Sequence, residues 1–479
     1  MRNSRLLAIL LGLCATIVAG LTTSATAGAA RNLDYGFVED QFSDSLLTNP
    51  NSAISNRWSN RYRKTNSDVV RVNLYWSQVA GTSPPTNPTN PADPSYDWTT
   101  PDAALLNAKK QGIDVVYTVI AAPRWAEGPN RDPEARIGTW RPDPDRFRDF
   151  AEAVATRYSG RFGSLPQVKY FEGWNEPNLP RYLSPQWDGK KPKSPAIYRD
   201  LVNGFYEGIK AGNENAKVIA GGTSPFGDDR GGKRMRPYYF WRKVLCLKDS
   251  KKLKKEKNCA KGEDRAHFDI YAHNPINGVK GEGPTTKSPN PDDGVPSNFK
   301  DLTKIVKAAE KRKTVLPKKK GRPGWGTETW YESKPPEKKA VSLKKQAEFM
   351  QQALYVLWKQ KVETVFFLQL RDSPYDPSLP GLNDFQTGVY RANDKPKPSL
   401  KAVQFPFVGD RKSKKKVLIW GIAPKGGKLT IKDKKEKLKK VRVKKSKVFT
   451  TTVKLKKSKK KHKLQGQIGK DKSLVWKQK

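Results

Sequence analysis

A repeating alternation of short β-rich runs and helical patterns constrains this 479-residue chain most strongly. Each run ends in polar or aromatic residues, and a segment with the apolar spacing of a helix follows it. Eight such units predict an α/β fold, a (β/α)8 TIM barrel, in which an active site would lie at the carboxyl ends of the strands. The predicted strands cover residues 33–38, 69–76, 113–121, 168–174, 217–222, 268–273, 324–330 and 365–370.

The segments between these strands predict helices and long loops. Residues 81–101 and 180–195 are rich in proline, and residues 226–264 are rich in glycine and lysine. Loops this long in a compact domain usually have a function, so we expect them on the active-site face. The predicted helices cover residues 102–111, 144–158, 197–211, 299–311 and 343–359.

After Val408 the pattern changes to short β-rich runs about ten residues apart, which predicts a small antiparallel β-sandwich. Lysine-rich disorder is the alternative. The predicted domains are therefore a signal peptide at 1–30, a barrel at 31–408 and a lysine-rich β-sandwich at 409–479. The β-rich runs of the tail cover residues 417–420, 429–431, 441–443, 448–455, 464–468 and 473–476.

The first thirty residues have the pattern of an export signal. Arg2 and Arg5 precede an apolar stretch from Leu6 to Leu21, and Ala25-Thr26-Ala27 forms a cleavage site, with cleavage after Ala30 as the alternative. The apolar stretch is too short and too broken by glycine for a transmembrane helix. We therefore expect a secreted, extracellular protein with no transmembrane segment after signal cleavage, and retention at the cell wall is the alternative.

Two cysteines, Cys246 and Cys259, lie beyond the signal. In an oxidising compartment they are predicted to form a disulfide that closes a lysine-rich loop, and two free thiols are the alternative. His267, His273 and His462 show no ligand spacing with the cysteines or with one another, so we expect no metal site. No organic cofactor is implied either.

The formal charge of +45 is concentrated in the tail. From Arg411 to Lys479 there are 28 lysines or arginines against Asp433, Glu436 and Asp471. Such a field attracts polyanions. Lysine supplies point charge and not the planar fork that reads bases or phosphates specifically, so we expect no specific nucleic-acid binding. An anionic wall polymer or acidic polysaccharide is the predicted partner of the tail, and a merely solvated surface is the alternative.

Two glutamates stand at the ends of the fourth and seventh predicted strands, each beside a tryptophan. Glu176 lies in Trp174-Asn175-Glu176-Pro177, and Glu328 lies in Thr327-Glu328-Thr329-Trp330. Cleavage of a glycosidic bond needs a proton for the leaving oxygen and a carboxylate on the opposite face of the sugar. The acid must have a raised pKa, which burial or a second carboxylate provides. The pair therefore predicts glycoside hydrolysis.

These motifs resemble those of the clan A retaining glycoside hydrolases, with the family 5 and family 39 barrels nearest, over residues 33–408. Val70-Arg71-Val72 is similar to the strand-two arginine of that clan. The resemblance implies that Glu176 is the acid/base and Glu328 the nucleophile. It also implies that Asn175 contacts the sugar 2-hydroxyl and that Arg71 keeps Glu328 ionised.

Two positions depart from the family pattern. His273 lies in Tyr271-Ala272-His273-Asn274-Pro275-Ile276, where Ile276 stands in place of the family's tyrosine. On the eighth strand, Gln369 and Arg371 occupy the region where a tryptophan is common. His273 remains a candidate substrate-binding residue. Tryptophan rings can stack on the apolar faces of sugars, and the candidate platforms are Trp76, Trp125 and Trp330.

These observations predict an exported retaining glycosidase whose substrate is a β-linked glycan or glycoside. A non-catalytic glycan- or wall-binding protein on a barrel that has lost its activity is one alternative. A transglycosidase, which transfers the sugar to another sugar and not to water, is the other.

Overall fold

The structure, a computed structural model, describes residues 29–39, 53–278, 281–375, 385–456 and 462–478. Almost all of the predicted export signal lies outside the described residues. Ala30, the last residue of that prediction, is buried, and its N–H donates to the carbonyl of Trp358 at 3.1 Å. Cleavage after Ala27 would keep this contact, whereas cleavage after Ala30 would remove it.

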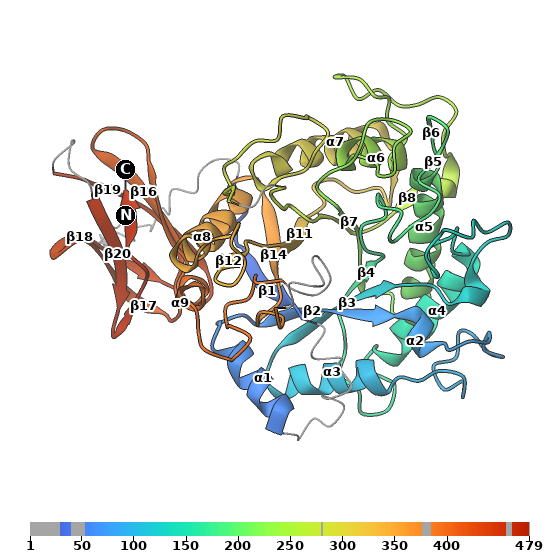
Figure 1. The fold of residues 1–479 in the computed structure, drawn as a ribbon, viewed down its shortest axis with the longest axis horizontal. Coiled ribbons are helices and arrows are strands. Elements are labelled where there is room, and N and C mark those ends of the chain that lie inside the picture. The colour runs from blue at the N-terminus through green and yellow to red at the C-terminus, as the bar shows by residue number, and fades with distance from the viewer. Residues whose placement is uncertain (1–28, 40–52, 279–280, 376–384, 457–461, 479) are drawn as a thin grey trace, which may run out of the picture.

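Eight parallel strands close into a barrel (Figure 1), which confirms the predicted (β/α)8 fold. Each predicted strand is present, and the ends differ from the prediction by at most three residues. Around the barrel the order is β1-β14-β11-β9-β7-β4-β3-β2. The strands are β1 (Asp34–Val38), β2 (Val69–Tyr75), β3 (Asp114–Ile120), β4 (Tyr170–Gly173), β7 (Lys217–Thr223), β9 (Ile270–His273), β11 (Gly324–Thr329) and β14 (Val362–Leu368).

Helices surround the barrel, and the five predicted ones are all present. The helices are α1 (Ala53–Arg63), α2 (Trp76–Val79), α3 (Thr99–Lys110), α4 (Pro144–Arg157), α5 (Ser194–Gly212), α6 (Pro237–Val244), α7 (Phe299–Arg312), α8 (Leu343–Lys359) and α9 (Pro398–Gln404). Helices α4 and α5 approach closely because α5 presents glycines to α4. A Cβ on Gly208 would lie 2.0 Å from the carbonyl oxygen of Arg148.

An apolar plug fills part of the barrel interior. The rings of Tyr170 and Trp325 lie 5.0 Å apart, and Phe366 packs on the other side of Trp325 at 6.2 Å. Packed interiors of this kind make such barrels a core and not a pore. The buried apolar residues of the plug are Val38, Val116, Ile219, Ile270, Ala272, Trp325 and Phe366.

The long loops carry short elements of their own. The loop after β4 contains the hairpin of β5 (Trp187–Asp188) and β6 (Lys191–Pro192), and the loop after β7 contains α6. In the loop before α3, the indole N–H of Trp98 donates to the carbonyl of Pro91 at 2.9 Å.

The tail folds into two antiparallel sheets, as predicted, and lies beside the barrel with α8 and α9 near it (Figure 1). One sheet has the order β15-β16-β19, and the other has the order β18-β17-β20-β21 with β22 also paired to β20. Strand β15 spans the boundary predicted at residue 409. The strands are β15 (Phe407–Arg411), β16 (Lys416–Ile422), β17 (Gly427–Asp433), β18 (Glu436–Val443), β19 (Val448–Lys454), β20 (His462–Ile468), β21 (Asp471–Lys472) and β22 (Trp476–Gln478).

The β-sandwich shares its core with the barrel. Trp420 of β16 is fully buried, and its ring lies 5.7 Å from that of Tyr355 and 5.9 Å from that of Trp358, both on α8. The two domains therefore cannot separate without exposing an aromatic cluster. No helix among the described residues combines the length and the apolar character needed to cross a membrane.

Candidate active site

A buried ion pair joins β2 to β4. Arg71 Nε donates to Glu172 Oε2 at 2.6 Å, and both side chains are at most 1% exposed. The hydroxyl of Thr118, on β3, donates to the same oxygen at 2.7 Å. The second arm of the guanidinium donates to Asn175 Oδ1 at 3.1 Å, which fixes the amide of Asn175. The expectation that Arg71 keeps Glu328 ionised stays a prediction, and Glu172 is a partner of Arg71 that the sequence motifs do not indicate.

Glu176 follows β4 in a strained turn. Trp174 and Glu176 have φ angles of 76° and 42°, in the left-handed region that side chains other than glycine rarely adopt. Hydrogen bonds hold the turn: the N–H of Glu176 donates to the carbonyl of Gly222 at 3.0 Å, and the indole of Trp174 donates to the carbonyl of Tyr182 at 2.8 Å. The turn therefore fixes where the carboxyl group of Glu176 lies.

Asn274 links the two glutamate strands. Its amide nitrogen donates to Glu176 Oε1 at 3.0 Å, and its amide oxygen accepts from the hydroxyl of Thr327 at 2.9 Å. Thr327 immediately precedes Glu328 on β11. Asn274 is fully buried, so this bridge is shielded from water. Sequence reasoning missed Asn274, although it directly follows His273 at the end of a predicted strand.

The pKa of Glu176 is raised to about 8, first by burial and then by the negative charge of Glu328. The hydrogen bond from Asn274 and the positive charges of Arg71 and Arg181 oppose this shift. The structure thus brings the two predicted catalytic glutamates within electrostatic reach of each other. A carboxyl group with this pKa holds its proton at neutral pH and can donate it.

Gly222 leaves room for the buried carboxylate of Glu172. Its φ is +54°, and a Cβ on it would lie 2.7 Å from Glu172 Oε1 and 3.3 Å from the hydroxyl of Thr327. Within the described part of the chain, Glu172 Oε1 has no hydrogen-bond partner. The glycine is thus required both by its backbone conformation and by the approach of the carboxylate.

His273 is held by protein atoms on both sides of its ring. Its Nδ1 lies 2.8 Å from the hydroxyl of Thr223, and its Nε2 lies 2.8 Å from the carbonyl oxygen of Gly294. Only a protonated nitrogen can donate to the Gly294 carbonyl, so Nε2 carries the hydrogen. Burial lowers the pKa of His273 to about 4. The histidine is therefore neutral, and both nitrogens that could bind a sugar are engaged.

The three candidate tryptophan platforms differ in their surroundings. Trp76 is fully buried and stacks on Phe150 at 5.4 Å. Trp125 is half-buried, with its edge against Trp76 at 5.9 Å. Trp330 is also half-buried and lines a cavity of about 90 Å³ together with Asn277. Trp330 is therefore the best placed of the three to meet a ligand.

Tyr182 is a further residue that sequence reasoning missed. Burial raises the pKa of its hydroxyl, and the charges of Glu176 and Glu328 raise it further. It thus lies near both glutamates. Ile276 is buried.

Gln369 and Arg371, which the sequence placed with the eighth strand, lie just after β14 and have different surroundings. The side-chain amide of Gln369 donates to the carbonyl of Phe385 at 2.6 Å. Arg371 instead binds Asp394 at 3.2 Å and stacks over Trp58 at 4.8 Å, so it serves the packing of α1.

Cys246 and Cys259 are joined by a disulfide in the loop after β7. Among the described residues, no three histidine, cysteine, aspartate or glutamate side chains gather as metal ligands would.

The sequence matches no model of a known protein family, and no curated protein matches it. Solved structures do match. A family 39 glycoside hydrolase from Bacteroides cellulosilyticus WH2 is 17% identical, with a TM-score of 0.52 over 89% of this chain and 81% of the other. A monomeric beta-xylosidase from Caulobacter crescentus CB15 is 16% identical, with a TM-score of 0.52 over 90% and 98%.

This chain has the fold of family 39 glycoside hydrolases. A glucosidase from Croceicoccus marinus also matches, with 12% identity and a TM-score of 0.50 over 90% of this chain and 95% of that one. The clan resemblance suggested by the Trp-Asn-Glu-Pro motif is thus confirmed at the level of the fold, and the family 39 barrels are among the structures that match.

Proposed function

We propose that this protein is an exported glycoside hydrolase that cleaves β-linked glycans or glycosides with retention of configuration. The observation that carries the proposal is the hydrogen-bonded carboxyl group of Glu176, whose pKa is raised first by its burial and then by the negative charge of Glu328, so that it keeps its proton. An acid that is protonated at neutral pH beside a second carboxylate is what a double displacement requires.

In the first step, a carboxylate oxygen of Glu328 bonds to the anomeric carbon while the bond to the leaving oxygen breaks. The proton of Glu176 moves to that oxygen. In the second step, water attacks the same carbon, the bond to Glu328 breaks, and Glu176 takes the proton of the water. Two inversions return the original configuration. Asn175, which Arg71 holds in place, would contact the sugar.

Assays on a panel of aryl glycosides would identify the sugar that the enzyme cleaves. Two of the matching structures are named as a beta-xylosidase and a glucosidase, so aryl β-xylosides and β-glucosides are the first substrates to test. NMR of the newly formed sugar should show the β-anomer first. An α-anomer formed first would contradict the double displacement. A substantial disaccharide product at high sugar concentration would favour the transglycosidase alternative.

A second role is supported by the outer face of the larger tail sheet. Lys428 pairs across the strands with Arg442, and Lys432 pairs with Lys437. Residues directly opposite in an antiparallel pair share a face, and like charges there destabilise the sheet. We call Lys428, Lys432, Lys437, Lys440 and Arg442 the basic face.

The acidic residues of this sheet are engaged by other partners. Asp433 binds His462 at 2.5 Å, Glu436 binds Lys456 at 2.6 Å and Asp471 binds Lys425 at 2.7 Å. The repulsion within the basic face would be relieved by an external polyanion, so we propose that it holds the enzyme on an acidic wall polymer or polysaccharide.

The test uses the full chain on a polygalacturonate column. Changing Lys428, Lys437, Lys440 and Arg442 to Gln should lower the salt concentration needed for elution, because exposed charges act through a screened field. The matched control removes four exposed lysines of α7 and the loop after it, by changing Lys300, Lys307, Lys311 and Lys318 to Gln. If both variants elute together, the basic face has no special role.

A further inference from the structure

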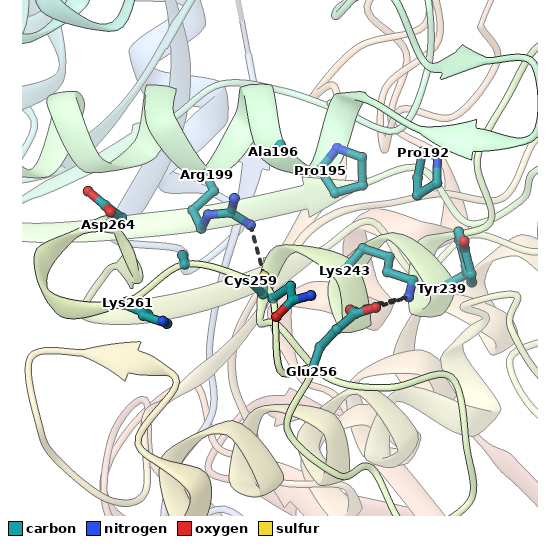
Figure 2. Close-up of a pocket in the computed structure, with 12 residues that line it drawn as sticks. Pro192, Pro195, Ala196, Arg199, Tyr239, Lys243, Glu256, Cys259, Lys261 and Asp264 are labelled. Atoms are coloured by element: carbon teal, nitrogen blue, oxygen red, sulfur yellow. Dashed lines mark hydrogen bonds and ion pairs between the residues drawn. The ribbon is translucent and has the colours of Figure 1, made fainter.

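A cavity of about 550 Å³ lies outside the catalytic pair, between the start of α5 and the disulfide loop (Figure 2). Its volume falls within the range of small-molecule sites, about 300–1,000 Å³. Helix α5 begins where the loop after β4 ends, and the disulfide loop follows β7. In a (β/α)8 barrel, these loops belong to the active-site face, so the cavity lies at the outer rim of that face.

Arg199 is the unusual residue of this cavity. Its side chain reaches from α5 toward the disulfide (Figure 2), where one arm lies 3.8 Å from the sulfur of Cys259 and 3.9 Å from that of Cys246. Its Nε is buried, and among the described residues it has no hydrogen-bond partner. Sulfur accepts hydrogen bonds weakly. Burial lowers the pKa of Arg199, and the charges of Asp200 and Asp264 oppose this shift without an ion pair to the guanidinium among the described residues. A buried guanidinium without a carboxylate in contact is costly unless a ligand supplies one.

The other residues that line the cavity determine which ligand charge it can accept. Lys243 binds Glu256 at 3.2 Å, and Lys261 and Asp264 also line the cavity. Three cations against two carboxylates leave a net charge of +1. A ligand with one negative charge neutralises the cavity. A phosphate with two negative charges would be repelled by the carboxylates of Glu256 and Asp264.

The shape of the cavity favours a ligand that carries an apolar surface as well as a negative charge. Pro192, Pro195 and Tyr239 form an apolar wall on one side of the cavity, and Asn258 adds an amide. The C–H faces of a sugar ring pack on such a wall, while a carboxylate on the same ring would reach the guanidinium. The planar fork of arginine matches the two oxygens of a carboxylate.

We propose that this cavity binds an acidic sugar, a uronate unit, through a bond between its carboxylate and the guanidinium of Arg199. The site is separate from the glutamate pair and does not depend on hydrolysis. It would hold one uronate residue of a glycan against the rim of the barrel.

The binding test uses the full-length Glu328→Gln protein, so that turnover plays no part. Titration calorimetry with sodium glucuronate at 150 mM salt should detect binding, and glucose should not compete for it. Arg199→Gln should weaken binding at least tenfold, and Lys300→Gln, which removes an exposed charge on α7, should change it less than twofold. Ala196→Trp, which fills the cavity from the first turn of α5 and keeps every charge, should weaken it as well.

A second readout localises the ligand. Because Cys259 lines the cavity, bound glucuronate should slow the reduction of the disulfide by dithiothreitol several-fold, and this protection should be lost in Arg199→Gln. The proposal is overturned if glucuronate fails to bind, or if Arg199→Gln and Ala196→Trp both bind it as the parent does. If sulfate competes with equal affinity, the site recognises a bare oxyanion, and the assignment to a sugar is wrong.

Discussion

Glu176 combines the two demands on a general acid, a fixed position and a proton held at neutral pH. Its pKa of about 8 has a direct consequence for rate. Because the protonated form is the active one, kcat/KM on an alkyl glycoside should fall as the pH rises through about 8. A pH profile between 5 and 10 checks this. A profile that stays level up to pH 10 would contradict the role of Glu176.

Replacing Glu176 separates its role from that of Glu328. Glu176→Ala should lower kcat/KM on alkyl glycosides by orders of magnitude. It should lower the rate of the glycosylation step much less on dinitrophenyl glycosides, whose leaving group needs no proton. Glu328→Ala should abolish turnover on both, since no nucleophile remains. Stopped-flow release of dinitrophenol measures the first step. Equal losses on both substrates in Glu176→Ala would show that the acid has been misassigned.

The raised pKa of Glu176 also makes the free energy of unfolding depend on pH. Between pH 4.5 and about 8, the native state keeps the proton of Glu176, whereas the unfolded chain has released it. The free energy of unfolding therefore falls as the pH rises across this window. Glu176→Gln should remove that slope and raise the stability at pH 8 by roughly 1 kcal/mol or more, with a smaller gain at pH 5. Urea unfolding at the two pH values measures the difference.

The Arg71–Glu172 pair shows what the sequence could and could not predict at this scale. Glu176 and Glu328 could be found because each stands in a short local motif. Arg71 and Glu172 are 101 residues apart, and only closure of the barrel brings them together.

Arg71→Met should destabilise the fold by about 3–5 kcal/mol, because it leaves a buried carboxylate without its partner. The double variant with Glu172→Leu should recover part of that loss in urea unfolding but none of the activity.

At the scale of the element, the end of β7 is shaped by Gly222. Gly163 provides a matched control, since its φ is +55° and a Cβ on it would meet no atom within 4 Å. Gly163→Ala should cost about 1 kcal/mol from backbone strain alone. Gly222→Ala should cost about 3 kcal/mol, because its methyl group would also collide with Glu172. Equal losses in thermal unfolding would show that the carboxylate moves aside freely.

The eight strands could be predicted because each is a short apolar run bounded by polar residues. The helices that sequence reasoning missed are harder to read. Helix α6 has only eight residues, of which four are aromatic, and its two charged residues, Arg242 and Lys243, are adjacent near its end, so no repeating polar pattern marks it. The contacts of Asn274 depend on three strands meeting at one edge, and no local pattern encodes such a meeting.

On the scale of the whole molecule, the barrel and the β-sandwich should unfold together. Trp420→Ala should destabilise the protein by about 3–5 kcal/mol, because the cluster with Tyr355 and Trp358 would lose its central ring. The thermal transition should remain single and move to lower temperature. A second, separate transition for the β-sandwich would contradict a shared core.

The apolar plug beneath the glutamates fills the barrel on one side of the proposed catalytic site, so that a sugar would reach this site from the mouth of the barrel. A polymer cannot be threaded through the barrel, because rings such as those of Tyr170 and Trp325 fill the passage. Every sugar unit that enters must leave by the way it came, and the departing product stands in the path of the next arrival. Product release and substrate entry at the barrel mouth would then limit the rate at which successive units of a long chain are cleaved, and the loops that border the mouth would influence both.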